Sequence, residues 1–241
     1  MRTSARPAAV FRFTRPVVAA SLALALASCS SGPRIVGGAA VPAVSPPGTP
    51  MMYVAIGASE TAGIGVADPV RDGWAYRFHR TALPRAAVFV NLAIPGATTA
   101  DALGRELPEA ERLHPDVVTV WLNVNDLEAG VPAATYGREM GILLHRLRGV
   151  RVLVANTPPL SSLPRFSGVQ GIDQLAARYD AALAHAVSGT GATIVDLGPF
   201  ARQAERRGTA GRFISDDGLH PNAAGYAAIA RVFERAFTAS Q

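Results

Sequence analysis

Cysteine and lysine are the residues that this sequence lacks most clearly. Cys29 is the single cysteine among 241 residues, so no disulfide can form within the chain. Cysteine and histidine also do not cluster with the spacing of a zinc site. All 23 basic residues are arginine, and the glycines of Gly63-Ile64-Gly65 are not followed by the lysine that a phosphate-binding loop requires. We therefore expect no metal and no nucleotide cofactor.

An excess of positive charge is also missing once the first residues are set apart. The formal net charge is +5, but four arginines and no acidic residue precede Cys29, so the charge of the remaining chain falls to +1. The other arginines are scattered and are not interleaved with aromatic residues, which make up only 7% of the chain. A nucleic-acid surface needs clustered basic residues. We therefore expect no nucleic-acid partner.

Long apolar runs are absent except at the N-terminus. Residues 17–27 follow an arginine-containing start and lead into Leu26-Ala27-Ser28-Cys29, which resembles the lipobox of bacterial lipoproteins. The resemblance implies that residues 1–28 are a signal peptide and that lipid is attached to Cys29. Two or more acyl chains would hold such a protein durably on a membrane. An ordinary signal peptide with a chance cysteine is the alternative.

The rest of the chain divides into a short linker and one domain. Residues 29–50 are rich in glycine, alanine and proline without sustained periodicity, which predicts a flexible tether. Residues 51–241 have a length that suits a single hydrophobic core. We expect a monomeric domain that is exported to the cell envelope and held there by its lipid.

Apolar, β-branched runs alternate with amphipathic segments throughout this domain. The runs predict buried strands, and the amphipathic segments predict helices. Such alternation predicts a parallel sheet covered on both faces, a three-layer α/β/α sandwich. The predicted strands are 52–56, 87–92, 117–122, 150–155 and 193–197, and the predicted helices are 73–83, 99–113, 134–147, 172–187 and 223–237.

Ligands of open parallel sheets bind at the carboxyl ends of the strands, so the residues after each predicted strand are the first candidates. Ser59 follows the first strand within Gly57-Ala58-Ser59. A serine hydroxyl needs a neighbouring base to act as a nucleophile. At this position Ser59 could equally be the cap of a helix.

His220 supplies the missing base. It lies three residues after Asp217, a spacing that lets the carboxylate reach Nδ1 of the imidazole within one turn and leaves Nε2 for the proton of a serine. The other four histidines lie in or beside amphipathic segments and are expected to be packing or surface residues. Asp216 is a rival partner for His220, and we favour Asp217.

Two further residues could stabilise an oxyanion, which ester cleavage requires. Asn125 offers a side-chain amide after the third strand, and Gly96 offers a backbone N–H after the second. Glycine and asparagine are also common turn residues at strand ends. The case for both rests on their occurrence together with Ser59 and His220.

The ordered blocks Gly57-Ala58-Ser59, Gly96, Asn123-Val124-Asn125-Asp126 and Asp217-Gly218-Leu219-His220-Pro221 resemble those of the SGNH hydrolases, or GDSL esterase/lipase family. The resemblance implies a flavodoxin-like sheet with strand order 2-1-3-4-5. It also implies a triad of Ser59, His220 and Asp217, and an oxyanion hole formed by Ser59, Gly96 and Asn125. The chain departs from the pattern at two positions, Ala58 for an aspartate and Asn123 for a glycine.

These features predict a serine esterase or lipase that acts through an acyl-enzyme. Two alternatives remain open at this stage. An acyltransferase would use the same site with a sugar or lipid hydroxyl in place of water. A catalytically silent envelope-binding lipoprotein would retain only the fold. The loop 158–166, which contains leucine and phenylalanine, is expected to border the pocket.

Overall fold

The computed structural model describes residues 48–240. The predicted signal peptide, Cys29 and nearly all of the tether lie outside the described residues. Within them, five strands form one sheet in the order β2-β1-β3-β4-β5, and all neighbouring strands are parallel. This confirms the predicted sheet and its strand order. The strands are β1 (Met52–Gly57), β2 (Val88–Asn91), β3 (Val117–Trp121), β4 (Arg151–Ala155) and β5 (Thr193–Val195).

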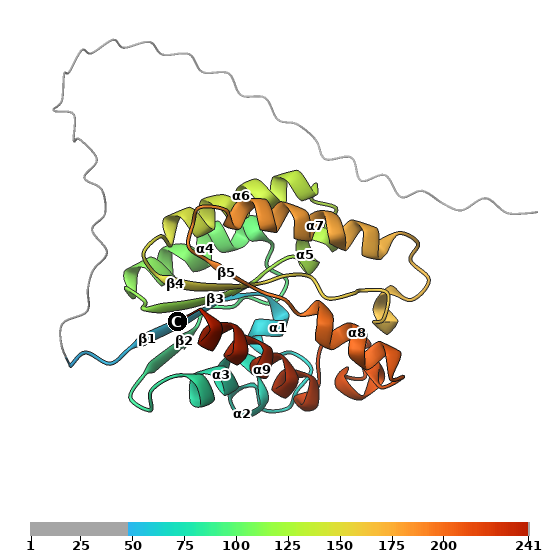
Figure 1. Ribbon diagram of the computed structural model, residues 1–241, viewed down its shortest axis with the longest axis horizontal. Coiled ribbons are helices and arrows are strands. Elements are labelled where there is room, and N and C mark those ends of the chain that lie inside the picture. The colour runs from blue at the N-terminus through green and yellow to red at the C-terminus, as the bar shows by residue number, and fades with distance from the viewer. Residues whose placement is uncertain (1–47, 241) are drawn as a thin grey trace, which may run out of the picture. The chain divides into compact units, whose positions relative to one another are not determined.

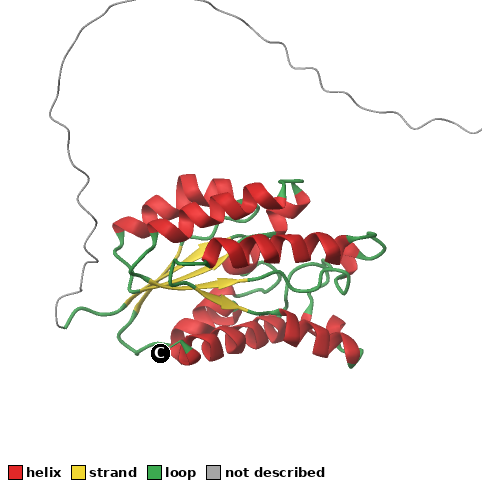
Figure 2. Cartoon of the chain, turned by 45° about the horizontal axis from the view of Figure 1, so that its top comes forward, coloured by secondary structure: helices red, strands yellow, loops and turns green. Residues whose placement is uncertain are grey.

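Helices cover both faces of the sheet. Figure 1 shows α4 (Thr99–Arg112), α6 (Ala133–Arg146) and α7 (Ile172–Val187) on one face, and α2 (Pro69–Asp72), α3 (Trp74–Ala82) and α9 (Ala223–Ala239) on the other. The turned view in Figure 2 shows the strands enclosed between these two helical layers. The predicted three-layer α/β/α sandwich is therefore confirmed.

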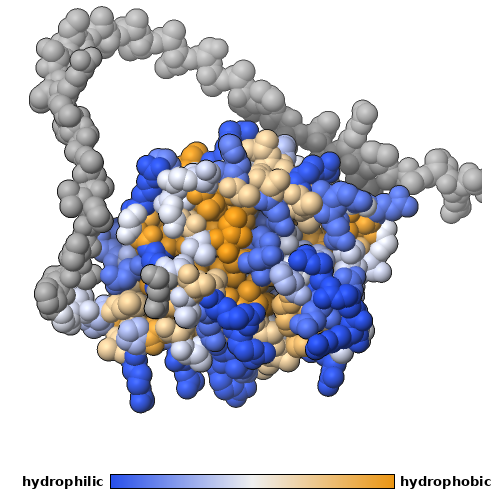
Figure 3. All heavy atoms as spheres, viewed as in Figure 1, coloured by the Kyte–Doolittle hydropathy of each residue, from blue (hydrophilic) through white to orange (hydrophobic). Residues whose placement is uncertain are grey.

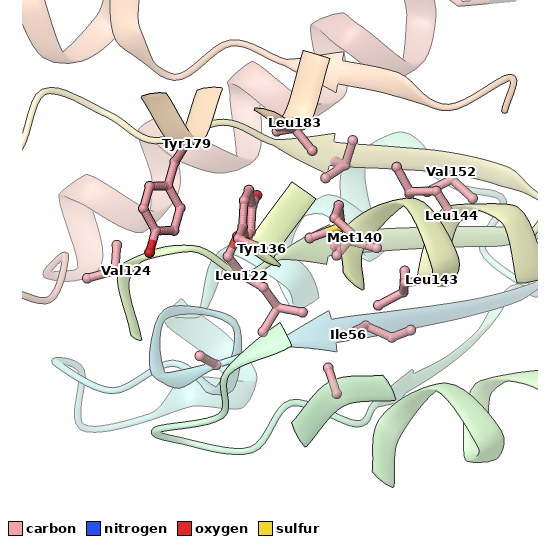
Figure 4. Packing of buried hydrophobic residues seen from close by; sticks show 14 of the residues in the cluster. Ile56, Leu122, Val124, Tyr136, Met140, Leu143, Leu144, Val152, Tyr179 and Leu183 are labelled. Atoms are coloured by element: carbon pink, nitrogen blue, oxygen red, sulfur yellow. The ribbon is translucent and has the colours of Figure 1, made fainter. Parts of the chain in front are cut away.

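Each face of the sheet has its own apolar core because alternate side chains of a strand point in opposite directions. In β3, Val118 and Val120 belong to the core beneath α4, α6 and α7, whereas Val117 and Trp121 belong to the core beneath α3 and α9. Figure 4 shows the first core from close by. There, Tyr136 and Tyr179 lie near each other, with ring centroids 4.9 Å apart. A strand buried on both faces explains why the sequence reads as a continuous apolar run.

The five predicted helices are present, with small differences at their ends. Several further elements were not predicted, most of them because three to five residues are too few to show a helical period. The helix Gly198–Arg206 was missed although it is as long as α3. Two of the unpredicted elements matter for function, since they begin directly after strands β1 and β3. The unpredicted elements are α1 (Ser59–Ala62), α2, α5 (Val124–Glu128), α8 (Gly198–Arg206) and the 3-10 helices η1 (Pro164–Phe166) and η2 (Ala210–Phe213).

The surface of the described domain mixes polar and apolar groups. Figure 3 shows hydrophobic atoms between hydrophilic ones on one face. Large apolar side chains that are exposed lie on separate elements and do not define one continuous patch; they are Ile64, Val70, Val88, Ile142 and Val169. No helix among residues 48–240 has the length and apolar character needed to cross a membrane.

Candidate active site

Ser59 lies at the tight exit from β1 into α1. Gly57 is required there, because a Cβ at this position would lie 2.2 Å from the Thr61 hydroxyl oxygen and 2.9 Å from the carbonyl oxygen of Trp121. Ala58 is buried, whereas Ser59 is partly exposed at the first position of α1. The sharp turn therefore leaves the Ser59 hydroxyl accessible at the carboxyl edge of the sheet.

Asp217 and His220 form a compact turn that fixes the imidazole. The distance from His220 Nδ1 to Asp217 Oδ2 is 2.6 Å. The other carboxylate oxygen, Oδ1, accepts hydrogen bonds from the backbone N–H groups of Leu219 and His220, both at 2.9 Å, and from the Ser215 hydroxyl at 2.8 Å. Asp217 is thus the carboxylate that contacts the His220 imidazole and holds the ring in place.

The electrostatics of this turn keep Asp217 ionised. Partial desolvation acts to raise the pKa of the carboxyl group, but the hydrogen bonds from His220, Leu219 and Ser215 outweigh it and hold the pKa well below its usual range. Nε2 of His220 is buried and makes no hydrogen bond within residues 48–240. The imidazole therefore has one nitrogen bound to a carboxylate and the other available to a reacting group.

The segment that follows Ser59 packs against His220. Gly65 adopts a left-handed conformation, with φ of +98°, and a Cβ at this position would lie 2.6 Å from the Pro221 carbonyl oxygen and 2.9 Å from His220 Cβ. The hydroxyl of Tyr226 in α9 donates a hydrogen bond of 2.5 Å to the carbonyl of Ile64. These contacts join the start of the domain to its last helix and bring Ser59 and His220 to the same region.

Gly96 lies on the loop after β2, and Asn125 lies in the first turn of α5, the helix after β3. The Asn125 side-chain amide donates a hydrogen bond of 3.0 Å to the carbonyl of Ala97, next to Gly96. Gly96 is exposed, has φ of +82°, and would carry a Cβ with no atom within 4 Å. One hydrogen bond thus joins Asn125 to Ala97, the residue after Gly96, and the Gly96 backbone is open to an approaching group.

Asp126 anchors this side of the site. It is fully buried and accepts hydrogen bonds from the backbone N–H and the hydroxyl of Thr99 in the first turn of α4. Desolvation by burial raises the pKa of Asp126, while the hydrogen bonds from Thr99 act to lower it. The carboxyl group joins α5, which carries Asn125, to the start of α4.

Glu60 is a site residue that the sequence did not reveal. Its side chain is buried, and its Oε2 accepts a hydrogen bond of 3.2 Å from the Ser59 hydroxyl. Desolvation by burial raises the pKa of Glu60, an effect that its backbone hydrogen bond and the nearby His220 oppose. A glutamate on a short helix is ordinarily exposed, so nothing in the sequence indicated that Glu60 is buried. The only available signal was its position directly after Ser59.

Glu106 is a second unpredicted carboxyl group near the nucleophile. It lies on α4 with 1% of its surface exposed, and its Oε2 accepts a hydrogen bond of 2.8 Å from the backbone N–H of Gly57. Burial raises its pKa to about 7. A helical period does reveal it, since Ala102, Glu106 and Ala110 are spaced four residues apart on the buried face of α4.

The two departures from the family pattern are accommodated without strain. Asn123 has φ of 171°, which is extended backbone that any residue adopts. Its side chain is buried, and neither polar atom of its amide makes a hydrogen bond within the described domain. Ala58 is buried beside Ser59. Both departures therefore change the polarity around the nucleophile and leave the backbone geometry intact.

Groups of three or more histidine, cysteine, aspartate or glutamate side chains placed to hold a metal ion are absent from residues 48–240. The buried carboxyl groups near Ser59 accept hydrogen bonds from the chain itself, Glu106 from Gly57 and Asp126 from Thr99.

The strand order, a serine at the exit of β1 and an Asp-x-x-His turn before the last helix together define an ester hydrolase of the SGNH class. The sequence model of the GDSL-like lipase/acylhydrolase family matches residues 55–228. This chain belongs to that family. No curated protein matches the sequence significantly.

Several solved structures share this fold. TesA is 20% identical, with a TM-score of 0.62 over 79% of this chain and 100% of its own. A lipase/acylhydrolase from Enterococcus faecalis is 22% identical, with a TM-score of 0.60 over 77% and 94%. The psychrotrophic esterase EstA from Pseudoalteromonas sp., inhibited by monoethylphosphonate, is 18% identical, with a TM-score of 0.61 over 78% and 97%.

Proposed function

We propose that this enzyme hydrolyses carboxylic esters through an acyl-enzyme formed on Ser59. The Ser59 oxygen attacks the carbonyl carbon while its proton passes to Nε2 of His220. The bond to the alcohol then breaks, and the alcohol leaves with that proton. Water attacks the acyl-enzyme, gives a proton to His220, and releases the acid as the proton returns to Ser59.

The bond between Asp217 and His220 is the observation that carries this proposal. At 2.6 Å from Nδ1, the carboxylate favours the tautomer in which Nε2 is free to accept a proton. The ionised carboxylate also stabilises the imidazolium that forms when His220 takes the proton. Ser59 needs both effects because an isolated serine hydroxyl is a poor nucleophile.

The backbone N–H groups of Ser59 and Gly96 and the side-chain amide of Asn125 are the proposed oxyanion donors. The Asn125 amide already has one N–H directed to the Ala97 carbonyl, and its second N–H remains for the substrate. Each such donor contributes about 3 kcal/mol to stabilisation of the transition state.

Hydrolysis of a p-nitrophenyl ester by Ser59→Ala tests the proposal. We expect kcat to fall by about 10⁴-fold or more, since removal of a serine nucleophile leaves only binding and oxyanion stabilisation. Ser188→Ala, at the exposed end of α7, is the matched control and should retain full activity. Wild-type turnover by Ser59→Ala would refute the proposed mechanism.

The cellular location is a separate part of the proposal. The lipobox-like sequence at Cys29 supports export and lipid attachment, which would hold the hydrolase on the cell envelope. Expression with a radiolabelled fatty acid should label the wild-type protein and leave Cys29→Ala unlabelled. Equal labelling of the two proteins, or none in either, would overturn lipid attachment without affecting the catalytic proposal.

A further inference from the structure

A largely apolar cavity opens beside the candidate site, with a volume of about 80 Å³. It extends from Glu60 and from Leu219, the residue before His220, to the loop after β4 and to helix α8. Its wall includes Trp121, Leu163, Phe200 and Phe213. The loop after β4 was expected to border the pocket, whereas α8 and η2 were not predicted. The cavity has the size and lining of a site for a short apolar group.

Glu60 is the charged residue in the wall of this cavity. Within the described domain, no arginine forms an ion pair with it; the titratable groups that interact with it electrostatically are His220 and Glu128. A buried carboxylate without a cationic partner is costly, because its lost hydration is not offset by an opposite charge or by enough hydrogen-bond donors. A ligand that brings such a donor would regain part of this free energy.

The position of Glu60 defines where on a substrate the donor must be. Oε2 of Glu60 lies 3.2 Å from the Ser59 oxygen, the atom that becomes bonded to the acyl carbonyl carbon. A substituent on the carbon next to this carbonyl is two bonds further on, a separation that lets it come within hydrogen-bonding reach of the Glu60 carboxyl group. The remainder of the acyl chain can then enter the apolar cavity.

We propose that Glu60 and this cavity select acyl groups that combine a hydrogen-bond donor on the carbon next to the carbonyl with a short apolar tail, that is, 2-hydroxyacyl or 2-aminoacyl esters. The inference rests on the proposed function, since it assigns the acyl specificity of the same site. Glu60 acts here as a specificity residue, because it touches the substrate and takes no part in breaking its bonds.

The test compares the ethyl esters of pentanoic, 2-hydroxypentanoic and 2-aminopentanoic acids. Each kcat/KM is divided by the rate of alkaline hydrolysis of the same ester, which removes the intrinsic activation by the substituent. A hydrogen bond to a charged group predicts that the wild-type enzyme prefers one or both substituted esters by at least about tenfold. The normalised ratio is the normalised kcat/KM of a substituted ester divided by that of the pentanoate ester. A wild-type ratio near or below one for both substituted esters would overturn the inference.

Variants of Glu60 then identify the source of the preference. Glu60→Leu should bring the normalised ratios to within about twofold of one, because it removes every hydrogen-bond acceptor. Glu60→Gln should abolish the preference for the 2-amino ester and retain part of that for the 2-hydroxy ester, since an amide oxygen accepts a hydrogen bond but carries no charge. Unchanged ratios in Glu60→Leu would overturn the inference.

Matched controls separate specificity from folding and from the proposed function. Glu109→Gln removes a solvent-exposed carboxylate that is paired with Arg112 and should leave the ratios unchanged; if it abolishes the preference as Glu60→Leu does, the assignment to Glu60 is wrong. Circular dichroism checks that each variant is folded. If the wild-type enzyme hydrolyses the pentanoate ester as well as its substituted forms, the inference fails while the proposed function stands. If Ser59→Ala equals the wild type on all three esters, the proposed function fails.

Filling the cavity gives a readout that does not depend on Glu60. Ala204 of α8 lines the cavity, and Ala204→Leu should lower the ratio of pentanoate to acetate hydrolysis by about tenfold, because the longer chain loses its space and the acetyl group does not. An unchanged ratio in the folded variant would show that the acyl chain lies elsewhere.

Discussion

The two sides of the candidate site differ in how firmly they are held. On the base side, Asp217 accepts four hydrogen bonds, and Gly65 leaves no room for even a methyl group beside His220. On the oxyanion side, Gly96 is exposed, a Cβ added to it would meet no atom within 4 Å, and one hydrogen bond joins Asn125 to its loop. The base is therefore fixed before substrate arrives, whereas the Gly96 loop has space to adjust.

This difference matches the chemical requirements of the two sides. Proton transfer needs a defined tautomer and a short distance, and a rigid turn supplies both. The oxyanion side must admit the substrate before its donors can act, so an open backbone at Gly96 is suitable. Substitutions on the base side should consequently be less tolerated than equivalent ones on the oxyanion side.

Replacement of Asp217 should have the largest effect. Asp217→Asn removes the charge that stabilises the imidazolium and changes the group facing Nδ1, so we expect kcat to fall by about 10³- to 10⁴-fold. Steady-state kinetics on a p-nitrophenyl ester measure this change. Asp216→Asn is the matched control and should remain within about twofold of the wild type. Equal losses in the two variants would contradict the assignment of Asp217.

Replacement of Asn125 should have the next largest effect. Asn125→Ala removes one oxyanion donor and its hydrogen bond to Ala97, and should lower kcat by about 10²- to 10³-fold with a smaller change in KM. A loss confined to KM would instead show that Asn125 binds the ground state, and it would contradict its role in the oxyanion hole.

Two glycines allow a direct comparison of the two sides. Gly65 and Gly96 both have left-handed backbones, with φ of +98° and +82°, so alanine introduces similar backbone strain of about 1 to 2 kcal/mol at each. Only at Gly65 does the methyl group also collide with Pro221 and His220. We expect Gly65→Ala to lose about 10²-fold in kcat/KM and about 2 to 5 kcal/mol of unfolding free energy.

Gly96→Ala should lose less than about tenfold in activity, because its methyl group meets open space. Denaturant unfolding and kinetics of the two variants, measured side by side, test this comparison. Equal losses of activity and stability would show that backbone strain alone controls both sites.

Glu106 should give the smallest effect on activity and a distinct effect on stability. Its pKa is about 7 in the folded protein and near 4.5 when unfolded, so the unfolded state binds fewer protons between these values. Stability therefore falls as pH rises from 4.5 to 7, by up to about 3 kcal/mol from this group.

Glu106→Gln should flatten this part of the stability profile, because glutamine does not titrate. Urea unfolding at pH 5 and pH 7.5 measures the difference, and Glu109→Gln, a solvent-exposed carboxylate on the same helix, serves as the control. A profile that Glu106→Gln leaves unchanged would show that Glu106 does not titrate in this range.

The sheet was predicted well from the sequence, because the apolar run that marks each strand is a local pattern. The apolar run 117–122 became β3, and the alternation of such runs with helices allows few topologies. The end of β5 was placed too late, since the strand ends at Val195 and Asp196 turns to accept a hydrogen bond from the backbone N–H of Gly198 in α8. A side chain that bonds its own backbone in this way competes with strand continuation.

The candidate site was predictable in part. Ser59, His220, Asp217, Gly96 and Asn125 follow strands or occupy a short turn, and the structure places them at one edge of the sheet. Glu60 was not predicted, because burial of a carboxyl group on a short helix depends on which elements pack over it and not on its neighbours in sequence. Glu106 was overlooked, although its four-residue spacing from Ala102 and Ala110 places it on the buried face of α4. Of the cavity wall only the loop 158–166 was predicted, since the rest of the wall combines residues from distant segments.

Covalent labelling of Ser59 tests the central claim most directly. A fluorophosphonate probe followed by peptide mass spectrometry should place the adduct on Ser59 in the wild-type enzyme, and labelling should be at least about 100-fold slower in the folded His220→Gln variant because the base is lost. An adduct on a different serine, or equal labelling rates in the two proteins, would contradict the account.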